Sequence, residues 1–331
     1  MELIHTAMQN LLSPVILFFL VGLLAGVFKS SLTIPPSLGK TISLYLVMAI
    51  GFRGGVELAH TGVSNAILAA IVLAVALSAG IPFLAYALLR LTTKVDRVNA
   101  AVVAAHYGSV SVVTFATAVA ILGQLEEYFE PYVVALLAVK EAPAILSGLL
   151  LAKRRRIGAR TPAGIVDLSS SNSVVRQVLL HGSVMLLLGS FLAGWITGPK
   201  GLVDLSPVFV DLFKGVLCLF LLDMGLVVAR RISDLKRLSF GLVAFGLYMP
   251  LIGAAAGLGC AWILGLSPGG ATLLAVLAAS ASYIVVPAVM RTAVPEASPA
   301  IYITLALGIT FPFNLVVGIP LYHYSARLLM G

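Results

Sequence analysis

Charged residues are scarce in this chain: Asp, Glu, Lys and Arg together make up 10% of its 331 residues. Soluble domains carry about 25% of such residues, so too few are present to cover a water-soluble surface. Cysteine is scarce as well. The two cysteines, Cys218 and Cys260, both lie in apolar segments, which favours buried thiols over a disulfide or a metal site.

Signatures of energy-coupled or metal-dependent enzymes are also missing. The sequence has no Walker loop, no His-Glu-x-x-His and no Cys-x-x-Cys. We therefore expect no enzyme activity and no cofactor. Without a nucleotide-binding site in the chain, any transport runs on an ion gradient or downhill.

Apolar residues dominate what is present. They make up 60% of the chain, and the mean hydropathy is +1.08. They occur in blocks of about 20 residues, the length that spans a bilayer as a helix. We expect an all-α polytopic membrane protein with ten transmembrane helices, over residues 13–28, 40–58, 66–91, 99–122, 131–152, 176–197, 207–229, 237–264, 270–293 and 299–324.

The basic residues gather between these spans on one side of the membrane. They are Lys29, Lys40, Arg90, Lys94, Arg97, Lys153, Arg154, Arg155, Arg156, Arg160, Arg176, Arg230, Arg231, Lys236, Arg237 and Arg291. The other side has Lys200 and Arg327 with the acidic residues Glu126, Glu127 and Glu130. Because cytoplasmic loops are enriched in Lys and Arg, we expect a plasma (inner) membrane protein with both termini outside and the basic 153–160 loop in the cytoplasm. This pattern also explains the sequence pI of about 9.6 without a nucleic-acid partner.

The two halves of the chain are similar to one another. Residues 100–114 align with 271–285, and Glu141-Ala142-Pro143 aligns with Thr310-Phe311-Pro312. We expect a first repeat at 1–152, a basic linker at 153–175 and a second repeat at 176–331. Five spans in each half is an odd number, so the second copy enters the membrane from the opposite side. The fold expected is a 5+5 inverted repeat, common in secondary transporters.

Helices 4 and 9 each carry a small, polar run near the middle. The first is Gly108-Ser109-Val110-Ser111 and the second is Ala279-Ser280-Ala281-Ser282. We expect both helices to break there and to cross, because broken helices at bilayer depth line cavities. Each second half-helix begins with about half a positive charge, which suits a small anion. The expected substrate-binding residues are Gly108, Ser109, Val110, Ser111, Ser280, Ala281, Ser282 and Tyr283. The alternative is that these small residues only allow close helix packing.

Four further residues supply oxygen atoms that suit sodium, a hard cation. They are Glu141, Asp223, Thr310 and Asn314. Alternatives stay open for each. Lys140 could pair with Glu141 or point elsewhere, and Asp223 could pair with Arg53, which lies opposite it in the other repeat. Thr310 and Asn314 could instead form hydrogen bonds between helices and bind no ion. Sodium is the only metal ion that we expect here, as a co-transported ion. His106 either titrates during transport or is satisfied by a backbone carbonyl.

At these residues the chain resembles the cyanobacterial-type sodium-dependent bicarbonate transporter family. The similarity lies in 279–291, in Pro295-Glu296-Ala297, in 306–314 and in 318–323, and in the first half at 54–55, 107–111 and 141–145. The resemblance implies the ten-helix inverted-repeat fold and sodium-coupled uptake of bicarbonate in carbon concentration. It also implies assembly as a homotrimer and a cytosolic PII-like regulatory protein as a partner.

Three functions therefore compete. The first is a sodium–bicarbonate symporter, in which sodium cancels the anion's charge against a membrane potential that opposes entry by about 2.3 kcal/mol per 100 mV. The second is a sodium-coupled symporter of another small organic anion, which extra apolar lining such as Phe115 would suit. The third is a non-transporting membrane receptor for the PII-like regulator.

Overall fold

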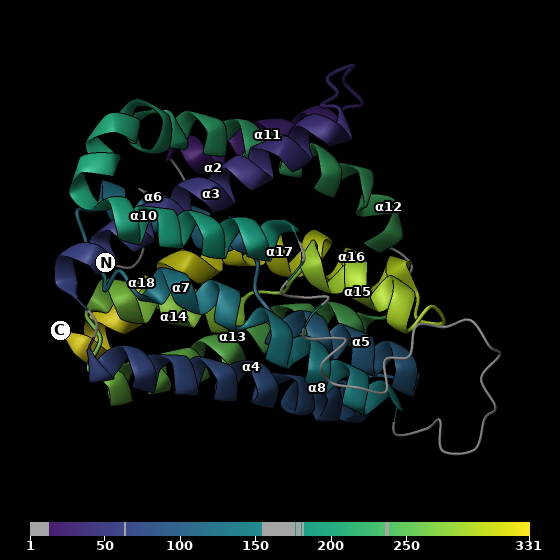
Figure 1. The fold of residues 1–331 in the computed structure, drawn as a ribbon. Helices are drawn as coiled ribbons and strands as arrows, with labels where there is room; N and C mark the ends of the chain where they lie inside the picture. Colours follow the sequence, from purple (N-terminus) through teal and green to yellow (C-terminus); the bar gives the residue numbers. More distant parts are fainter. Residues whose placement is uncertain (1–12, 63, 154–175, 177–179, 181, 236–237) are drawn as a thin grey trace.

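The computed structural model describes residues 13–62, 64–153, 176, 180, 182–235 and 238–331. Every regular element in these ranges is a helix, and no strand occurs among them (Figure 1). The all-helical fold expected from the apolar blocks is confirmed. The 153–175 linker, apart from Lys153, lies outside the described residues.

Seven helical stretches are long and apolar enough to cross a membrane within the described ranges. They cover Pro36–His60, Asn65–Thr92, Arg97–Gln124, Val133–Ala152, Val184–Arg230, Phe240–Leu264 and Pro299–Met330. Pro14–Val27 and Pro268–Ala279 are apolar but shorter. The chain is thus a multi-pass membrane protein. The count differs from ten because Val184–Arg230 runs together two expected spans, the helix at Pro14–Val27 is only about 21 Å long, and the expected ninth span is interrupted.

Many helices begin where the sequence offers a cap. Ser13, Asp96, Ser239 and Ser267 each accept a hydrogen bond from a backbone N–H in the first turn of the helix that follows. Such side chains satisfy the free N–H groups at a helix start. Proline at the first helical position, where no N–H is needed, marks several other starts.

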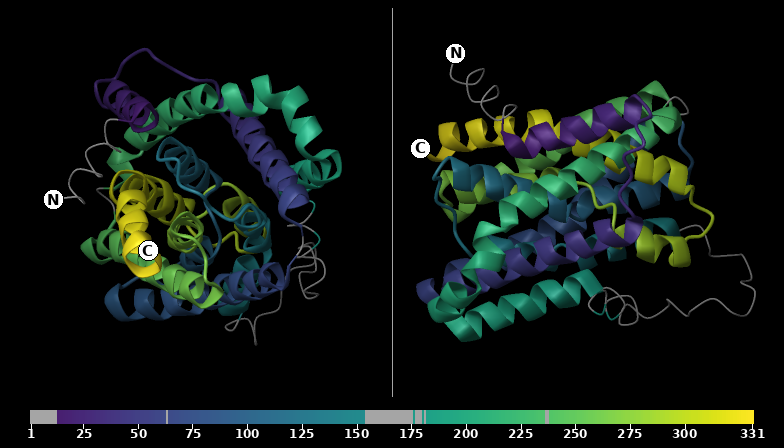
Figure 2. Two further views of the ribbon diagram at one scale, coloured as in Figure 1. Left: turned by 90° about the vertical axis from the view of Figure 1, so that its left-hand side faces the viewer. Right: turned by 90° about the horizontal axis from the view of Figure 1, so that it is seen from above.

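Four helices form a layer along one side of the molecule, which we call the panel. They are α2 (Pro14–Val27), α3 (Pro36–Thr61), α10 (Gly182–Ser206) and α11 (Phe213–Arg230). Within the panel, α2 packs on α11 and α3 packs on α10. The panel lies at the top of Figure 1, and the end-on view in Figure 2 shows it curving around the remaining helices.

The other long helices form a bundle beside the panel. Its first-half members are α4 (Asn65–Thr92), α5 (Arg97–Gly108), α6 (Val112–Gln124), α7 (Val133–Val139) and α8 (Glu141–Lys153). Its second-half members are α13 (Phe240–Leu264), α14 (Pro268–Ala279), α15 (Val285–Ala293), α16 (Pro299–Leu305), α17 (Phe311–Phe313) and α18 (Ile319–Met330), with π-helical turns at Ala306–Thr310 and Asn314–Gly318. A further π-helical turn (Pro207–Asp211) and the short α12 (Ile232–Leu235) flank α11.

The centre of the bundle is built from small residues. Every residue from Ala100 to Leu122 is buried, and α14 is buried from Gly269 onward. A Cβ added at Gly253 of α13 would lie 2.2 Å from the carbonyl oxygen of Ala278 in α14, so glycine is what allows these two backbones to touch. The broken helices are therefore the core of the molecule.

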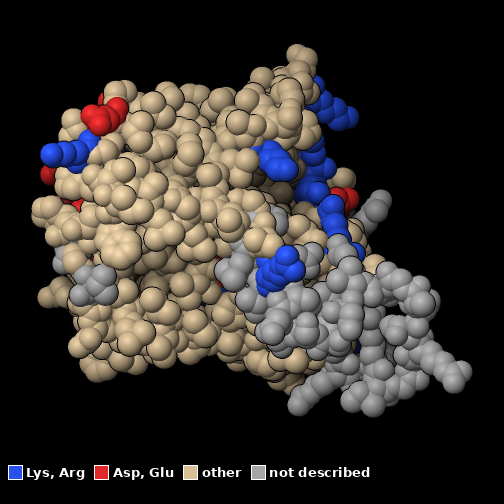
Figure 3. Space-filling model, viewed as in Figure 1, with Lys and Arg blue, Asp and Glu red and all other residues tan. Residues whose placement is uncertain are grey.

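Charge is divided between the two ends of the bundle. On the face drawn in Figure 3, most Lys and Arg side chains lie at the end where α12 and α15 are found, and most Asp and Glu lie at the opposite end. We call the second end the acidic end, because the Glu126–Glu130 loop lies there. The distribution fits the asymmetry read from the sequence. Which end faces the cytoplasm stays a prediction.

Candidate functional site

The first small, polar run separates two helices. α5 ends at Gly108 and α6 begins at Val112. Ser111 caps α6, because its Oγ accepts a hydrogen bond of 3.2 Å from the Thr114 N–H. The hydroxyl of Ser109 donates to Oε2 of Glu141 at 2.5 Å. The break therefore holds a buried carboxylate beside the start of α6.

The second run interrupts the chain in the same way. α14 ends at Ala279 and α15 begins at Val285. The Oγ of Ser282 accepts from the Val286 N–H at 3.4 Å, but the residue directly before α15 is Ile284, which has no capping side chain. Ser280 and Ala281 are buried between the two helices. Small residues are suited to both breaks, since the backbone here must pass close to its neighbours.

The two breaks are in direct contact. The Ser111 N–H donates to the Oγ of Ser280 at 3.0 Å, and the Ser282 N–H donates to the carbonyl oxygen of His106 at 2.8 Å. Segments from the two halves of the chain thus meet inside the bundle and satisfy each other's freed backbone groups. We call residues 109–111 and 280–284 the crossing.

A small cavity of ≈ 10 Å³ lies at the crossing. It is lined by Ser43, Val47, Val110, Ser111, Val112, Glu141, Ser282, Tyr283, Ile284 and Val285. The starts of α6 and α15 both lie on its wall, and a helix start carries about half a positive charge. The cavity has room for about one water-sized species. An anion of several atoms enters only if the walls move apart.

The structure places the expected substrate residues in two groups. Val110, Ser111, Ser282 and Tyr283 line the cavity. The others support it: Ser109 holds Glu141, Ser280 accepts from the Ser111 N–H, Gly108 packs against Pro82 and the Ser78 carbonyl, and Ala281 is buried. Substrate contact at these residues stays a prediction.

Of the expected sodium ligands, Glu141 is on the cavity wall, whereas Asn314 contacts the end of α14 and does not line the cavity. The Asn314 amide donates to the carbonyl oxygen of Ala279 at 2.9 Å, and its oxygen accepts from the Tyr322 hydroxyl at 2.7 Å. Thr310 donates to the Gly246 carbonyl at 2.8 Å and lies 2.6 Å from the Tyr107 hydroxyl. Asn314 and Thr310 thus join helices in this conformation. Their role toward sodium stays a prediction.

Asp223 lies apart from these groups, on α11 of the panel. A Cβ on Gly39 would lie 2.4 Å from its Oδ2, so its carboxylate packs against the start of α3. Arg53 lies elsewhere on α3, with its guanidinium carbon 6.0 Å from the centre of the Phe213 ring. The described contacts contain no ion pair between Arg53 and Asp223, the pairing weighed from the repeat alignment.

Sequence reasoning missed the contribution of α3 to the cavity. Ser43 and Val47 line the crossing cavity, and Ile50, Gly54 and Glu57 line a larger cavity of ≈ 260 Å³ toward the acidic end. These residues recur every three or four positions, so they form one stripe along α3. That spacing is visible in the sequence and could have indicated one functional face of α3.

The larger cavity, which we call the outer cavity, continues the same line between three helices. Its wall also includes Arg53, Val119 of α6 and Val134 of α7, with Glu127 and Tyr128 from the loop. A second small cavity, lined by Val47, Val112, Leu137 and Glu141 among others, lies against the crossing cavity. α3, α6 and α7 therefore carry a row of spaces from the acidic end to Glu141.

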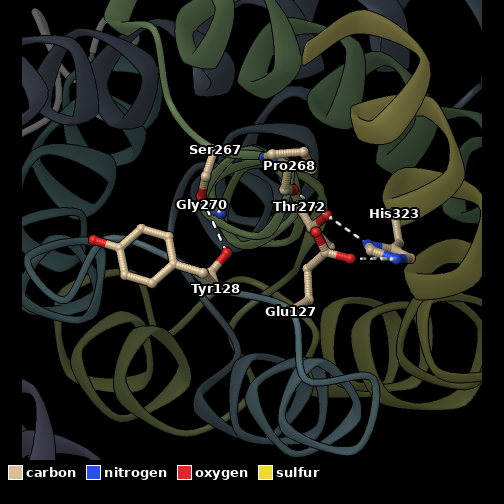
Figure 4. Close-up of polar contacts among 7 residues, drawn as sticks. All are labelled: Glu127, Tyr128, Ser267, Pro268, Gly270, Thr272 and His323. Carbon is tan, nitrogen blue, oxygen red and sulfur yellow. Dashed lines mark hydrogen bonds and ion pairs between the residues drawn. The ribbon is translucent and has the colours of Figure 1, made fainter. Parts of the chain in front are cut away.

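The acidic-end loop is fastened to the second half of the bundle (Figure 4). Oε2 of Glu127 lies 3.6 Å from Nε2 of His323 of α18, and the other ring nitrogen of His323 lies 3.2 Å from the Thr272 hydroxyl. Ser267, which caps α14, donates to the Tyr128 carbonyl at 3.1 Å. The sequence 265–269 does fit Gly-x-Ser-x-Gly, a pattern of serine hydrolases. Its serine serves here as a helix cap and loop anchor.

Within the described ranges, no group of three or more His, Cys, Asp or Glu side chains is placed to hold a metal ion.

The model of one protein family, described as the Na+-dependent bicarbonate transporter superfamily, matches residues 14–327 of the chain. No curated protein sequence matches it.

Proposed function

The chain belongs to the Na+-dependent bicarbonate transporter superfamily, and we propose that it is a secondary active symporter that brings bicarbonate into the cell together with sodium. Membership of this family points to a transporter and not to an enzyme. Both ions would bind at the crossing.

The single observation that carries the proposal is the contact between the two breaks. Two helix starts, α6 at Val112 and α15 at Val285, lie on the wall of one cavity. Together they supply on the order of one positive charge, and once the walls move apart their N–H groups and the serine hydroxyls would donate to anion oxygens. This combination suits one small oxyanion, and bicarbonate is one.

Glu141 supplies the reason for a cation at the same place. Its carboxylate is 2% exposed and lines the cavity next to the helix starts. A buried carboxylate is costly unless it is paired or hydrogen-bonded, and among the described residues Ser109 is the one hydrogen-bond donor to it. Sodium bound at Glu141 would neutralise it and attract the anion. Each ion would then raise the affinity for the other, which is thermodynamic coupling.

We propose that the fold is the ten-helix inverted repeat. Reciprocal packing supports this. The first helix of one half packs on the second helix of the other, as α2 on α11 and α10 on α3. The bundle shows the same relation, since Asn99 at the start of α5 accepts from the Ser298 N–H, and Glu130 accepts from the N–H of Ser267 at the start of α14, both at 2.7 Å. A two-fold relation makes such contacts occur in pairs.

We propose that ions reach the crossing from the acidic end through the outer cavity. The row of cavities along α3, α6 and α7 supports this route. Val47 and Val112 line the narrow part of the row. Movement of the bundle against the panel would open it, in the manner of transporters that rock one group of helices against another.

Uptake of labelled bicarbonate into proteoliposomes, with an inward sodium gradient or an equal potassium gradient, tests the proposal. We expect uptake with sodium only, and a loss of at least about tenfold in Ser282→Ala. Thr117→Val is the matched control, because the Thr117 hydroxyl donates to the Val113 carbonyl of its own helix and has no other hydrogen bond within the part of the chain that the structure describes. Equal uptake in both gradients would contradict sodium coupling.

The same vesicles separate the competing functions. Sodium-dependent uptake of organic anions without bicarbonate would favour the second candidate. The small cavity does not favour it, and Phe115 is buried without lining that cavity. No flux of any anion, with tight binding of a PII-like protein, would favour the receptor. The trimer and the regulator remain proposals from the resemblance, and the inner-membrane location and the extracytoplasmic termini remain proposals from the distribution of basic residues.

A further inference from the structure

Lys140 is a buried cation next to the proposed sodium ligand. It is the residue between α7 and α8. Its side chain is 0% exposed, and its Nζ has no hydrogen-bond partner among the residues that the structure describes. Its carbonyl oxygen accepts from the Ser78 hydroxyl, so its backbone is fixed. Buried ionisable residues within membrane spans are functional candidates.

The proposed sodium site does not use Lys140. Glu141 lines both small cavities, whereas Lys140 lines neither. The titratable groups that face Lys140 electrostatically are Cys260 of α13, which has the larger effect, and Glu141, the next residue in the chain. Adjacent residues of a helix face different directions. Sodium would therefore approach the Glu141 carboxylate from the cavity, which Lys140 does not line.

Sodium and Lys140 would therefore balance the charge of Glu141 at different stages of transport. With sodium and a monovalent anion bound, the four charges of Lys140, Glu141, sodium and anion sum to zero. With both ions released, Lys140 and Glu141 alone also sum to zero. Without Lys140, the empty carrier would hold a buried, unpaired carboxylate as it returned across the membrane, and such burial is strongly disfavoured.

We propose that Lys140 is the resident counter-ion of Glu141, neutralising it in the sodium-free carrier and thereby permitting the empty carrier to return. This inference rests on the proposed sodium-coupled function. In this role Lys140 is a positioning residue, because it affects transport through the charge of Glu141 and does not touch the transported anion. It weakens sodium binding moderately and makes release possible.

Lys140→Met tests this by removing the charge at similar length. Two rates are compared in proteoliposomes: net sodium-driven uptake of bicarbonate, and exchange of labelled for unlabelled bicarbonate with sodium on both sides. Exchange does not need the empty carrier to return. We expect net uptake to fall at least about tenfold while exchange stays within about twofold, and the half-saturating sodium concentration to fall about tenfold. Lys94→Met, at an exposed lysine between α4 and α5, should match the unchanged chain.

Two further variants identify the partner. In a Glu141→Gln background, Lys140→Met should have no further effect on sodium dependence, because the charge that it neutralises is gone. Cys260→Ser should leave both rates unchanged. If Cys260→Ser reproduces Lys140→Met, the partner is Cys260 and the inference is overturned.

The failure of this inference differs from failure of the proposed function. If the unchanged chain shows no sodium-dependent uptake, the proposed function fails, and this inference fails with it. If uptake is sodium-dependent but Lys140→Met lowers net uptake and exchange by the same factor, or changes neither rate, the proposed function stands. Only the role of Lys140 as counter-ion of Glu141 is then excluded. Size-exclusion profiles of the purified variants distinguish a variant that does not fold from a folded variant whose empty carrier does not return.

Discussion

Gly55 on α3 and Gly194 on α10 pack against one another's helix in the same way. A Cβ on Gly55 would lie 1.9 Å from the carbonyl oxygen of Phe191, and a Cβ on Gly194 would lie 2.0 Å from that of Phe52. Each phenylalanine precedes the other glycine by three positions. The contact is therefore self-complementary, as expected at a two-fold axis.

The same relation makes Gly194→Ala a test of panel packing. No real Cβ fits at such distances from a backbone atom, so the two helices must separate. Overpacking of this kind costs about 1–3 kcal/mol. We expect the free energy of unfolding to fall by that amount, and Gly55→Ala to lower it similarly, in thermal unfolding of the solubilised protein. Gly189→Ala on the same helix, where a Cβ meets nothing within 4 Å, is the control. Equal effects at Gly189 and Gly194 would contradict the packing described.

Glu141→Gln should separate sodium affinity from folding. The amide keeps the shape of the side chain and removes the charge that attracts sodium. We expect the half-saturating sodium concentration for uptake to rise at least about tenfold, equivalent to about 1.4 kcal/mol of lost binding free energy. Glu126→Gln, at an exposed loop glutamate, should not change it. An unaltered sodium dependence in Glu141→Gln would exclude Glu141 as the ligand.

Ser280→Ala addresses the contact between the breaks without touching the cavity wall. Its hydroxyl is the acceptor for the Ser111 N–H. A buried N–H left without a partner costs about 1–3 kcal/mol. We expect a lower unfolding temperature together with weaker apparent affinity for bicarbonate, because the start of α6 loses its position. Ser147→Ala, which removes a hydroxyl bonded to the Ala79 carbonyl away from the crossing, should leave bicarbonate affinity unchanged.

Much of this arrangement could be predicted from sequence, and the reason lies in local signals. Prolines, serine caps and apolar blocks are local, so helix positions followed from them. The breaks followed from two short runs that match between the halves. The position of Asp223 did not follow, because alignment to Arg53 in the repeat says which positions are equivalent and not which are in contact. Equivalent positions of an inverted repeat can lie on opposite sides of its axis.

The role of α3 also escaped the sequence analysis. Ser43, Val47, Ile50 and Glu57 have the spacing of one helix face, but one face of a membrane helix can lie against lipid, protein or a cavity. Only the packing of α3 against α6 and α7 decides this. The hydrogen bonds of Thr310 and Asn314 were equally undetermined, since their donors and acceptors come from α5, α13, α14 and α18.

Asp96, outside the membrane spans, gives a prediction for pH. Burial opposes ionisation of its carboxyl, but hydrogen bonds from Asn99 and Val98 outweigh this and lower the pKa of Asp96. A lowered pKa in the folded state stabilises the fold above the unfolded value of about 3.9, and this contribution is lost as the pH falls through the folded pKa. Asp96→Ala should therefore cost about 1 kcal/mol at pH 7, as for other N-caps, and less as the pH drops toward 3. Asp204→Ala, at an exposed aspartate of α10, is the control for thermal unfolding across this range.

Accessibility of Val134 tests the outer cavity as the entrance. Val134 lines that cavity from α7, with its side chain next to Gly54 of α3. In a Cys218→Ser/Cys260→Ser background, Val134→Cys should react with a charged, membrane-impermeant thiol reagent added outside. Because the attached group would fill part of a cavity of ≈ 260 Å³, we expect uptake to fall several-fold. Leu68→Cys, 66% exposed on the outer face of α4, should show no loss of uptake with the same reagent. Modification of Val134→Cys without any change in uptake would mean that ions reach the crossing by another route.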